Sequence, residues 1–148
     1  MKLSSKTFLA AIILPTLLSA CASQQQSDAA MITAQDLQHH NWQLVMIDDE
    51  ALASDPRQQK ARLEIGENLT ANGSAGCNNF FGQAELKDNQ LKIERMAMTM
   101  KMCPPEAMKI ERAMAETLAE WATISLSQEM LVLENDAHKL TFKLDDHK

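Results

Sequence analysis

Apolar and polar residues alternate along much of the chain between residues 41 and 144, and this alternation is typical of β-strands buried on one face. In the first such stretch, Trp42, Leu44 and Met46 share one face. Polar turn sequences such as Lys-Asp-Asn-Gln at 87–90 separate the stretches. The predicted strands are 41–47, 61–65, 69–72, 82–86, 91–94, 123–126, 130–133 and 138–144.

A helical pattern interrupts these strands after Pro104-Pro105. Apolar residues then recur at spacings of 3, 4, 4 and 3, which places them on one side of a helix. They are Ala107, Ile110, Met114, Leu118 and Trp121, whereas Lys109, Arg112, Glu116 and Glu120 are expected toward solvent. Proline in the first turn and Glu106 near the positive end of the helix dipole favour a helix start. The sequence therefore predicts one main α-helix over about residues 105–121.

A shorter helix over 34–39 is predicted by a capping pattern, because Asp36 follows Thr33 at the capping-box spacing. Strand patterns combined with one long helix indicate the α+β class.

The stretch from Gly73 to Gly82 concentrates glycine, asparagine and phenylalanine. Glycine reaches backbone conformations with positive φ at little steric cost, so this composition predicts tight turns or a close backbone approach. If the segment is extended, Phe80 and Phe81 point to opposite faces, and one of them should enter the core. Two interpretations stay open: a structural turn that carries a cysteine, or a ligand or partner site built on that turn.

Methionines occupy every second position from 96 to 102, which is strand periodicity and predicts that all four share one face. The pattern favours a core strand in which the flexible methionine side chain fills gaps. It also fits a soft apolar surface for a ligand or partner. A methionine copper site is disfavoured, because it would need sulfur ligands from another strand.

The N-terminus has the layout of a bacterial lipoprotein signal. Lys2 and Lys6 form a basic region, residues 8–18 form a short apolar region, and Leu-Ser-Ala-Cys at 18–21 resembles a lipobox. We expect residues 1–20 to be a signal peptide and Cys21 to be lipidated, with residues 21–32 as a flexible tether. Two or more acyl chains would anchor the protein stably. Ala22 favours the outer membrane over the inner membrane, with the domain facing the periplasm.

Charge argues against nucleic acid as a partner. The whole chain has a net charge of −6, and removing residues 1–20 takes away two lysines and no acids, which leaves −8. No basic cluster remains to attract a phosphate backbone. An acidic domain is also repelled by anionic lipid, so membrane attachment is expected through the lipid anchor alone.

With Cys21 assigned to lipid, Cys77 and Cys103 remain in an oxidising compartment, where a disulfide is the simple outcome. Closing a loop of roughly 27 residues would stabilise the fold by about 3–4 kcal/mol in the chain-entropy model. A redox-active pair is the alternative, although the spacing is not that of a Cys-x-x-Cys motif.

Catalytic and metal-binding patterns are weak in this chain. Ser74 has no histidine near it in sequence, and there is no Gly-x-Ser-x-Gly motif. The adjacent His39 and His40 would point in different directions without a third ligand, and His138 and His147 stand apart. We therefore expect no catalytic residues, no metal and no cofactor.

Several motifs in a fixed order resemble the META domain family. Gly-Cys-Asn at 76–78 is followed by Gly82, then by Thr99-x-x-x-Cys103, a helix and paired C-terminal strands. The resemblance covers about residues 33–145, within an expected domain of 33–148. It implies a compact α+β domain of about seven to eight mainly antiparallel strands, as a curled sheet or open barrel packed with one helix. It also implies a role in envelope stress, with family links to heat induction and novobiocin tolerance.

The chain departs from this family at two positions of the expected site. Family members often have arginine after the motif threonine, where this chain has Met100, with Lys101 one residue further on. Asn79 stands where a basic residue is common. The candidate binding residues are Asn78, Asn79, Phe80, Phe81, Thr99, Met100 and Lys101.

The family offers no established catalytic residues to carry over, so three functions stay open. The first is a non-enzymatic lipoprotein that binds an unknown envelope protein during stress. The second is a module for a small apolar ligand or lipid, with the methionine face and Phe80 or Phe81 lining a pocket. The third is a structural role beneath the outer membrane.

Overall fold

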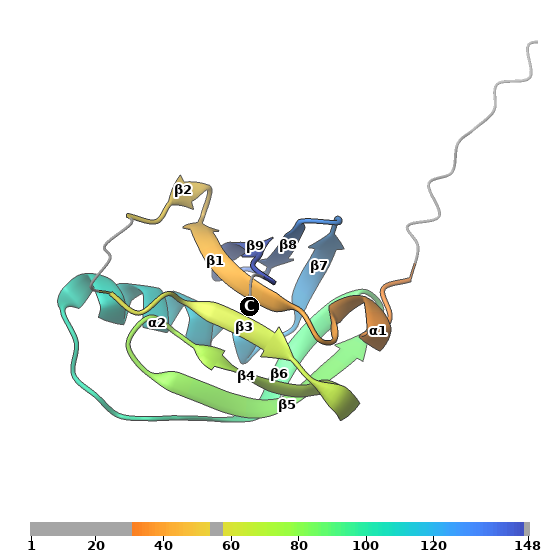
Figure 1. The fold of residues 1–148 in the computed structure, drawn as a ribbon, viewed down its shortest axis with the longest axis horizontal. Helices are drawn as coiled ribbons and strands as arrows, with labels where there is room; N and C mark the ends of the chain where they lie inside the picture. The colour runs from red at the N-terminus through yellow and green to blue at the C-terminus, as the bar shows by residue number, and fades with distance from the viewer. Residues whose placement is uncertain (1–30, 54–57, 147–148) are drawn as a thin grey trace, which may run out of the picture.

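Eight antiparallel strands close into a barrel in residues 31–53 and 58–146, which a computed structural model describes (Figure 1). The barrel order is β1-β3-β4-β5-β6-β7-β8-β9, and pairing of β9 with β1 closes it. The short strand β2 pairs with the last two residues of β1, Met46 and Ile47. The strands are β1 Asn41–Ile47, β2 Glu50–Ala51, β3 Arg62–Ile65, β4 Thr70–Ser74, β5 Asn79–Lys87, β6 Gln90–Met98, β7 Ala122–Leu126, β8 Met130–Glu134 and β9 Lys139–Leu144.

Two α-helices accompany the barrel: α1 Ala34–Leu37 and α2 Pro105–Leu118, with a 3-10 turn at Glu67–Leu69. Figure 1 shows the start of α2 and strand β2 at one end of the molecule and α1 at the other. The predicted α+β class, antiparallel strands and single main helix are confirmed. The barrel is closed rather than open, because five residue pairs join β1 to β9.

Alternating side chains of the strands fill the interior, as the sequence pattern predicts. Trp42, Leu63, Leu133 and Phe142 are almost fully buried, and Leu140 lies beside them in the same core cluster. Helix α2 contributes the face that its apolar spacing predicts. Its buried residues are Ala107, Ala113, Met114, Thr117 and Leu118. The helix therefore belongs to the core that the barrel encloses, and its first turn is held near the glycine-rich segment.

The prediction that four methionines share one strand face is wrong for the last two. Strand β6 ends at Met98, and only Met96 and Met98 pack against the core. A bulge interrupts the pairing of β6 with β5, and Arg95 has a positive φ of 51° there. Beyond the strand, Met100 and Met102 are 97% and 91% exposed. The alternation of methionines continues past the end of the strand, because the chain leaves the sheet after Met98 and leads to α2.

Both predicted helices extend too far. Helix α1 ends at Leu37, and His39 has a positive φ of 65° that no helix allows. Helix α2 ends at Leu118, so Trp121 lies beyond it, where the Lys92 ammonium sits 4.9 Å from the centre of the indole ring. At both helix ends, tertiary contacts outweigh the local helix preference that predicted a longer helix.

The expected signal peptide at 1–20, the lipidation site Cys21, most of the tether at 21–32 and His147 lie outside the described residues. No helix within the described ranges is long and apolar enough to cross a membrane.

Candidate functional site

Asn78 lies at the centre of the region that the sequence singled out, and it is only 2% exposed. Its side-chain amide donates to Oε2 of Glu111 at 2.9 Å and to the carbonyl oxygen of Lys101 at 3.1 Å. Its oxygen accepts bonds from Oγ1 of Thr99 at 2.8 Å and from the backbone N–H of Lys101 at 2.7 Å. The side chain therefore joins helix α2 to the segment 99–101.

These bonds use the capacity of the Asn78 amide, which has two donors and two lone pairs. The backbone N–H of Asn78 is also committed, because it donates to Oε2 of Glu111 at 3.0 Å. We infer that Asn78 positions its neighbours and does not itself contact a ligand. It explains why an asparagine follows the cysteine and why a threonine stands four residues before the second cysteine.

A disulfide fastens the same segment a second time. Cys77 and Cys103 are bonded, with a Cα–Cα distance of 5.9 Å, which confirms the expected pairing. The turn before Cys77 is closed by hydrogen bonds from Ala75 to Asn78 and from Gly76 to Ser74, and Gly76 has a φ of 90°. The predicted glycine turn is therefore present, and its role includes fixing the start of α2.

Phe80 and Phe81 take opposite faces, as expected for a strand. Phe80 is 3% exposed and belongs to the core, whereas Phe81 is 65% exposed. Asn79 is exposed, and its side-chain oxygen accepts a bond from Gln59. Its backbone carbonyl accepts the backbone N–H of Thr99, and its backbone N–H donates to Oγ1 of Thr99. Of the candidate binding residues, Asn78 and Phe80 are therefore buried, while the others reach solvent.

Three large apolar side chains are exposed to solvent at the end of the β5–β6 pair where β5 begins and β6 ends. We call Phe81, Met100 and Met102 the exposed apolar set, and each is at least 65% exposed. Phe81 pairs with Ala97 near the end of β6, and both methionines follow that strand in the segment fixed by Asn78 and the disulfide. Apolar side chains that gather on an exposed surface can mark a site for a partner, and methionine is common at such sites.

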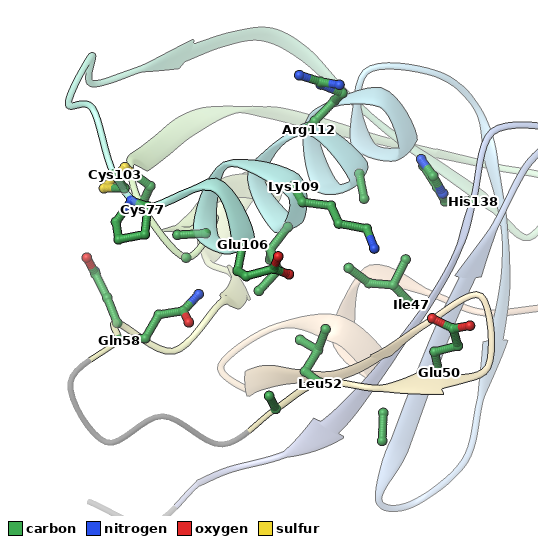
Figure 2. A pocket seen from close by; sticks show the side chains of 18 of the residues that line it. Ile47, Glu50, Leu52, Gln58, Cys77, Cys103, Glu106, Lys109, Arg112 and His138 are labelled. Carbon is green, nitrogen blue, oxygen red and sulfur yellow. A yellow bond between two sulfur atoms is a disulfide. The ribbon is translucent and has the colours of Figure 1, made fainter.

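A cleft of about 1230 Å³ lies between α2 and the β1–β2 hairpin (Figure 2). Its apolar lining includes Ile47 and Leu52 from the hairpin side and Ile110 from the helix. The disulfide borders one end of the cleft, and His138 borders the other. The sequence did not indicate this cleft, because its walls come from segments that are far apart in the chain and Lys109 was expected only to face solvent.

His138 is held between two carboxylates at the border of the cleft. Its Nδ1 lies 2.8 Å from Oδ2 of Asp48, and its Nε2 lies 3.4 Å from Oε2 of Glu116. Asp48 also accepts the backbone N–H of Lys139 at 2.8 Å. This backbone bond, and then the bond with His138, hold the pKa of Asp48 below its ordinary value. The arrangement ties the β1–β2 turn to β9 and α2.

Within residues 31–53 and 58–146, no group of three or more His, Cys, Asp or Glu side chains is arranged to hold a metal ion.

The antiparallel barrel with one main helix is the fold of a recognised class of domain. The META domain family matches residues 35–147, and the chain belongs to this family. The chain is 30% identical over 142 residues to heat shock protein HslJ of Escherichia coli K12, covering 95% of this chain and 97% of that protein.

Two structures determined by NMR have a similar fold. One has a TM-score of 0.69 and 32% identity, over 78% of this chain and 97% of its own. The other, from Burkholderia xenovorans, has a TM-score of 0.63 and 20% identity, over 97% of this chain and all of its own, and it supports the fold alone.

Proposed function

We propose that this protein is a non-enzymatic, lipid-anchored envelope protein that binds apolar segments of other envelope proteins during heat stress. The observation that carries the proposal is the exposed apolar set, with Phe81 on β5 and both methionines on a segment fixed by a disulfide and by Asn78. A segment whose backbone is already fixed has little backbone entropy left to lose on binding, which favours affinity. Methionine also adapts to partners of varied shape.

Two further observations support the setting. Disulfides persist in oxidising compartments such as the periplasm, which agrees with the expected export signal and lipidation at Cys21. The relative from Escherichia coli is named a heat shock protein. Lipid anchoring would hold the exposed apolar set close to the outer membrane, where heat-damaged envelope proteins would expose apolar surfaces.

The small-ligand alternative would need a pocket other than the one that the sequence suggested. Phe80, Met96 and Met98 pack against the core and do not line the cleft beside α2. A small ligand would instead belong in the cleft between α2 and the β1–β2 hairpin.

The test replaces the exposed apolar set by serine in the lipidated protein, as the triple variant Phe81→Ser, Met100→Ser and Met102→Ser. Met31→Ser is the matched control, because Met31 is also exposed, at 72%, but lies at the start of the described chain. We expect the triple variant to fold, to reach the outer membrane and to lose heat and novobiocin tolerance, while the control keeps both. Full tolerance in a folded triple variant would refute the proposal.

A second arm tests the anchor. Cys21→Ser should prevent palmitate incorporation and release the domain into the periplasm in soluble form. We expect it to lose tolerance although its disulfide forms. Full tolerance with a soluble domain would show that the anchor is dispensable.

A further inference from the structure

The cleft beside α2 has apolar walls that no part of the described chain covers. Ile47, Leu52 and Ile110 are half-buried and pack against the core from below, so their outer surfaces form the floor of the cleft. Ala107 and Ala113 are small, which keeps the helix side of the cleft open. The volume of about 1230 Å³ is larger than that of most ligand pockets. Water in contact with apolar walls is unfavourable, so displacing it by an apolar group lowers the free energy. An occupant with an apolar body is therefore favoured.

Lys109 supplies a cation directly over these walls. Figure 2 shows its side chain extending from α2 across the cleft toward Ile47. No carboxylate of the described residues lies within ion-pair distance of its ammonium, although several acids border the cleft. Arg112 and Lys101 add positive charge to the lining. An ammonium next to apolar surface interacts more strongly with an anion than one in open water.

The acids that border the cleft are placed differently from Lys109. Asp48 is committed to His138 and to the backbone of β9. Glu106 lies in the first turn of α2, where the helix dipole offsets its charge. Glu50 is exposed on β2, at the edge of the sheet. The lining therefore holds three acids and three cations, and Lys109 is the cation whose side chain crosses the cleft toward Ile47.

We propose that this cleft binds an amphipathic anion, separately from the exposed apolar set. Its apolar body lies against Ile47, Leu52 and Ile110, and its carboxylate or phosphate ester accepts hydrogen bonds from Lys109. Single-chain lipid anions and free aromatic acids share this chemistry.

The experiment titrates the ¹⁵N-labelled, oxidised domain with decanoate below its micelle-forming concentration and with 2-naphthoate, and it follows amide shifts. Decyltrimethylammonium has the same alkyl chain with the opposite charge and is the control probe. We expect saturable shifts at residues lining the cleft for an anion and weaker binding of the cation. Tighter binding of decanoate than of naphthoate assigns a lipid source, and the reverse order assigns a free aromatic acid.

Two substitutions test the role of the ammonium. Lys109→Met keeps an unbranched apolar side chain and removes its charge. It should weaken decanoate binding roughly tenfold and strengthen binding of the cation, because the ammonium that repels the cation is gone. Lys87→Met removes an exposed lysine from the β5–β6 hairpin, outside the cleft, and should change neither. Shifts outside the cleft, equal binding of both alkyl probes, or an unchanged affinity in Lys109→Met would each overturn the proposal.

Discussion

Replacing Asn78 by alanine tests whether this residue fixes the segment 99–101 to the helix. The substitution removes four side-chain hydrogen bonds to oxygen and nitrogen partners, on Glu111, on Thr99 and on both backbone groups of Lys101, together with a weak bond from the amide to Sγ of Cys77. It leaves the backbone of residue 78 and its bond to Glu111 in place. The disulfide also remains, so the segment stays tethered at Cys103 while its inner attachment is lost.

The expected loss of stability follows from these bonds. A neutral hydrogen bond contributes about 1 kcal/mol net, and a bond to a charged group contributes about 1.5–3 kcal/mol. Three neutral bonds and one bond to the Glu111 carboxylate would give about 4–6 kcal/mol if nothing replaced them. The partners are only partly buried, so water can satisfy some of them, and we expect a loss of about 2–4 kcal/mol.

The assay is equilibrium urea unfolding of the oxidised domain at neutral pH, with the free energy of unfolding compared between variants. Thr99→Ala is the control, because its hydroxyl makes one of these bonds to Asn78 and accepts one from the backbone N–H of Asn79, so it should cost only about 1–2 kcal/mol. Thr99→Ser, which keeps the hydroxyl, should cost less still. A loss below about 0.5 kcal/mol in Asn78→Ala would refute the view that this residue fixes the segment.

Three further predictions concern stability. Replacing Cys77 and Cys103 together by serine should lower the free energy of unfolding by about 3–4 kcal/mol in urea titrations, and an unchanged value would contradict the role given to the disulfide. Gly73→Ala should cost at least about 2 kcal/mol, because its Cβ would meet a carbonyl oxygen of β3, whereas Gly66→Ala meets only a movable hydroxyl and should cost less. Because the pKa of Asp48 is lowered by folding, its carboxylate stabilises the folded state at pH values above its ordinary pKa of 3.8, and this contribution is lost as the pH falls further. Asp48→Asn should therefore make the melting temperature less dependent on pH in the acid range.

Local patterns in the sequence predicted much of the fold. Strand alternation located β1 and β9, and the helical stripe located α2. The opposite orientations of Phe80 and Phe81 also followed from strand geometry alone. Each of these features depends on residues a few positions apart, which is the range over which sequence periodicity carries information.

Features that depend on distant residues could not be predicted in the same way. The bulge at Arg95 shifts the register of β6 against β5, and β6 then continues to Met98. The contact between His138 and Asp48 joins residues 90 positions apart. The hydrogen bonds of Asn78 to Glu111 likewise form only after α2 has packed on the barrel. The sequence therefore identified Asn78 but not its role as an anchor.

The most direct test of the proposed function is photo-crosslinking in cells from position 100 of the lipidated protein, with and without heat stress. Position 88, in the turn between β5 and β6, is the control, because it is exposed and lies at the opposite end of the β5–β6 pair from the exposed apolar set. We expect discrete protein adducts from position 100 that increase on heating, and few from position 88. Equal adducts from both positions, or none from position 100 in a folded and oxidised protein, would contradict the proposed function.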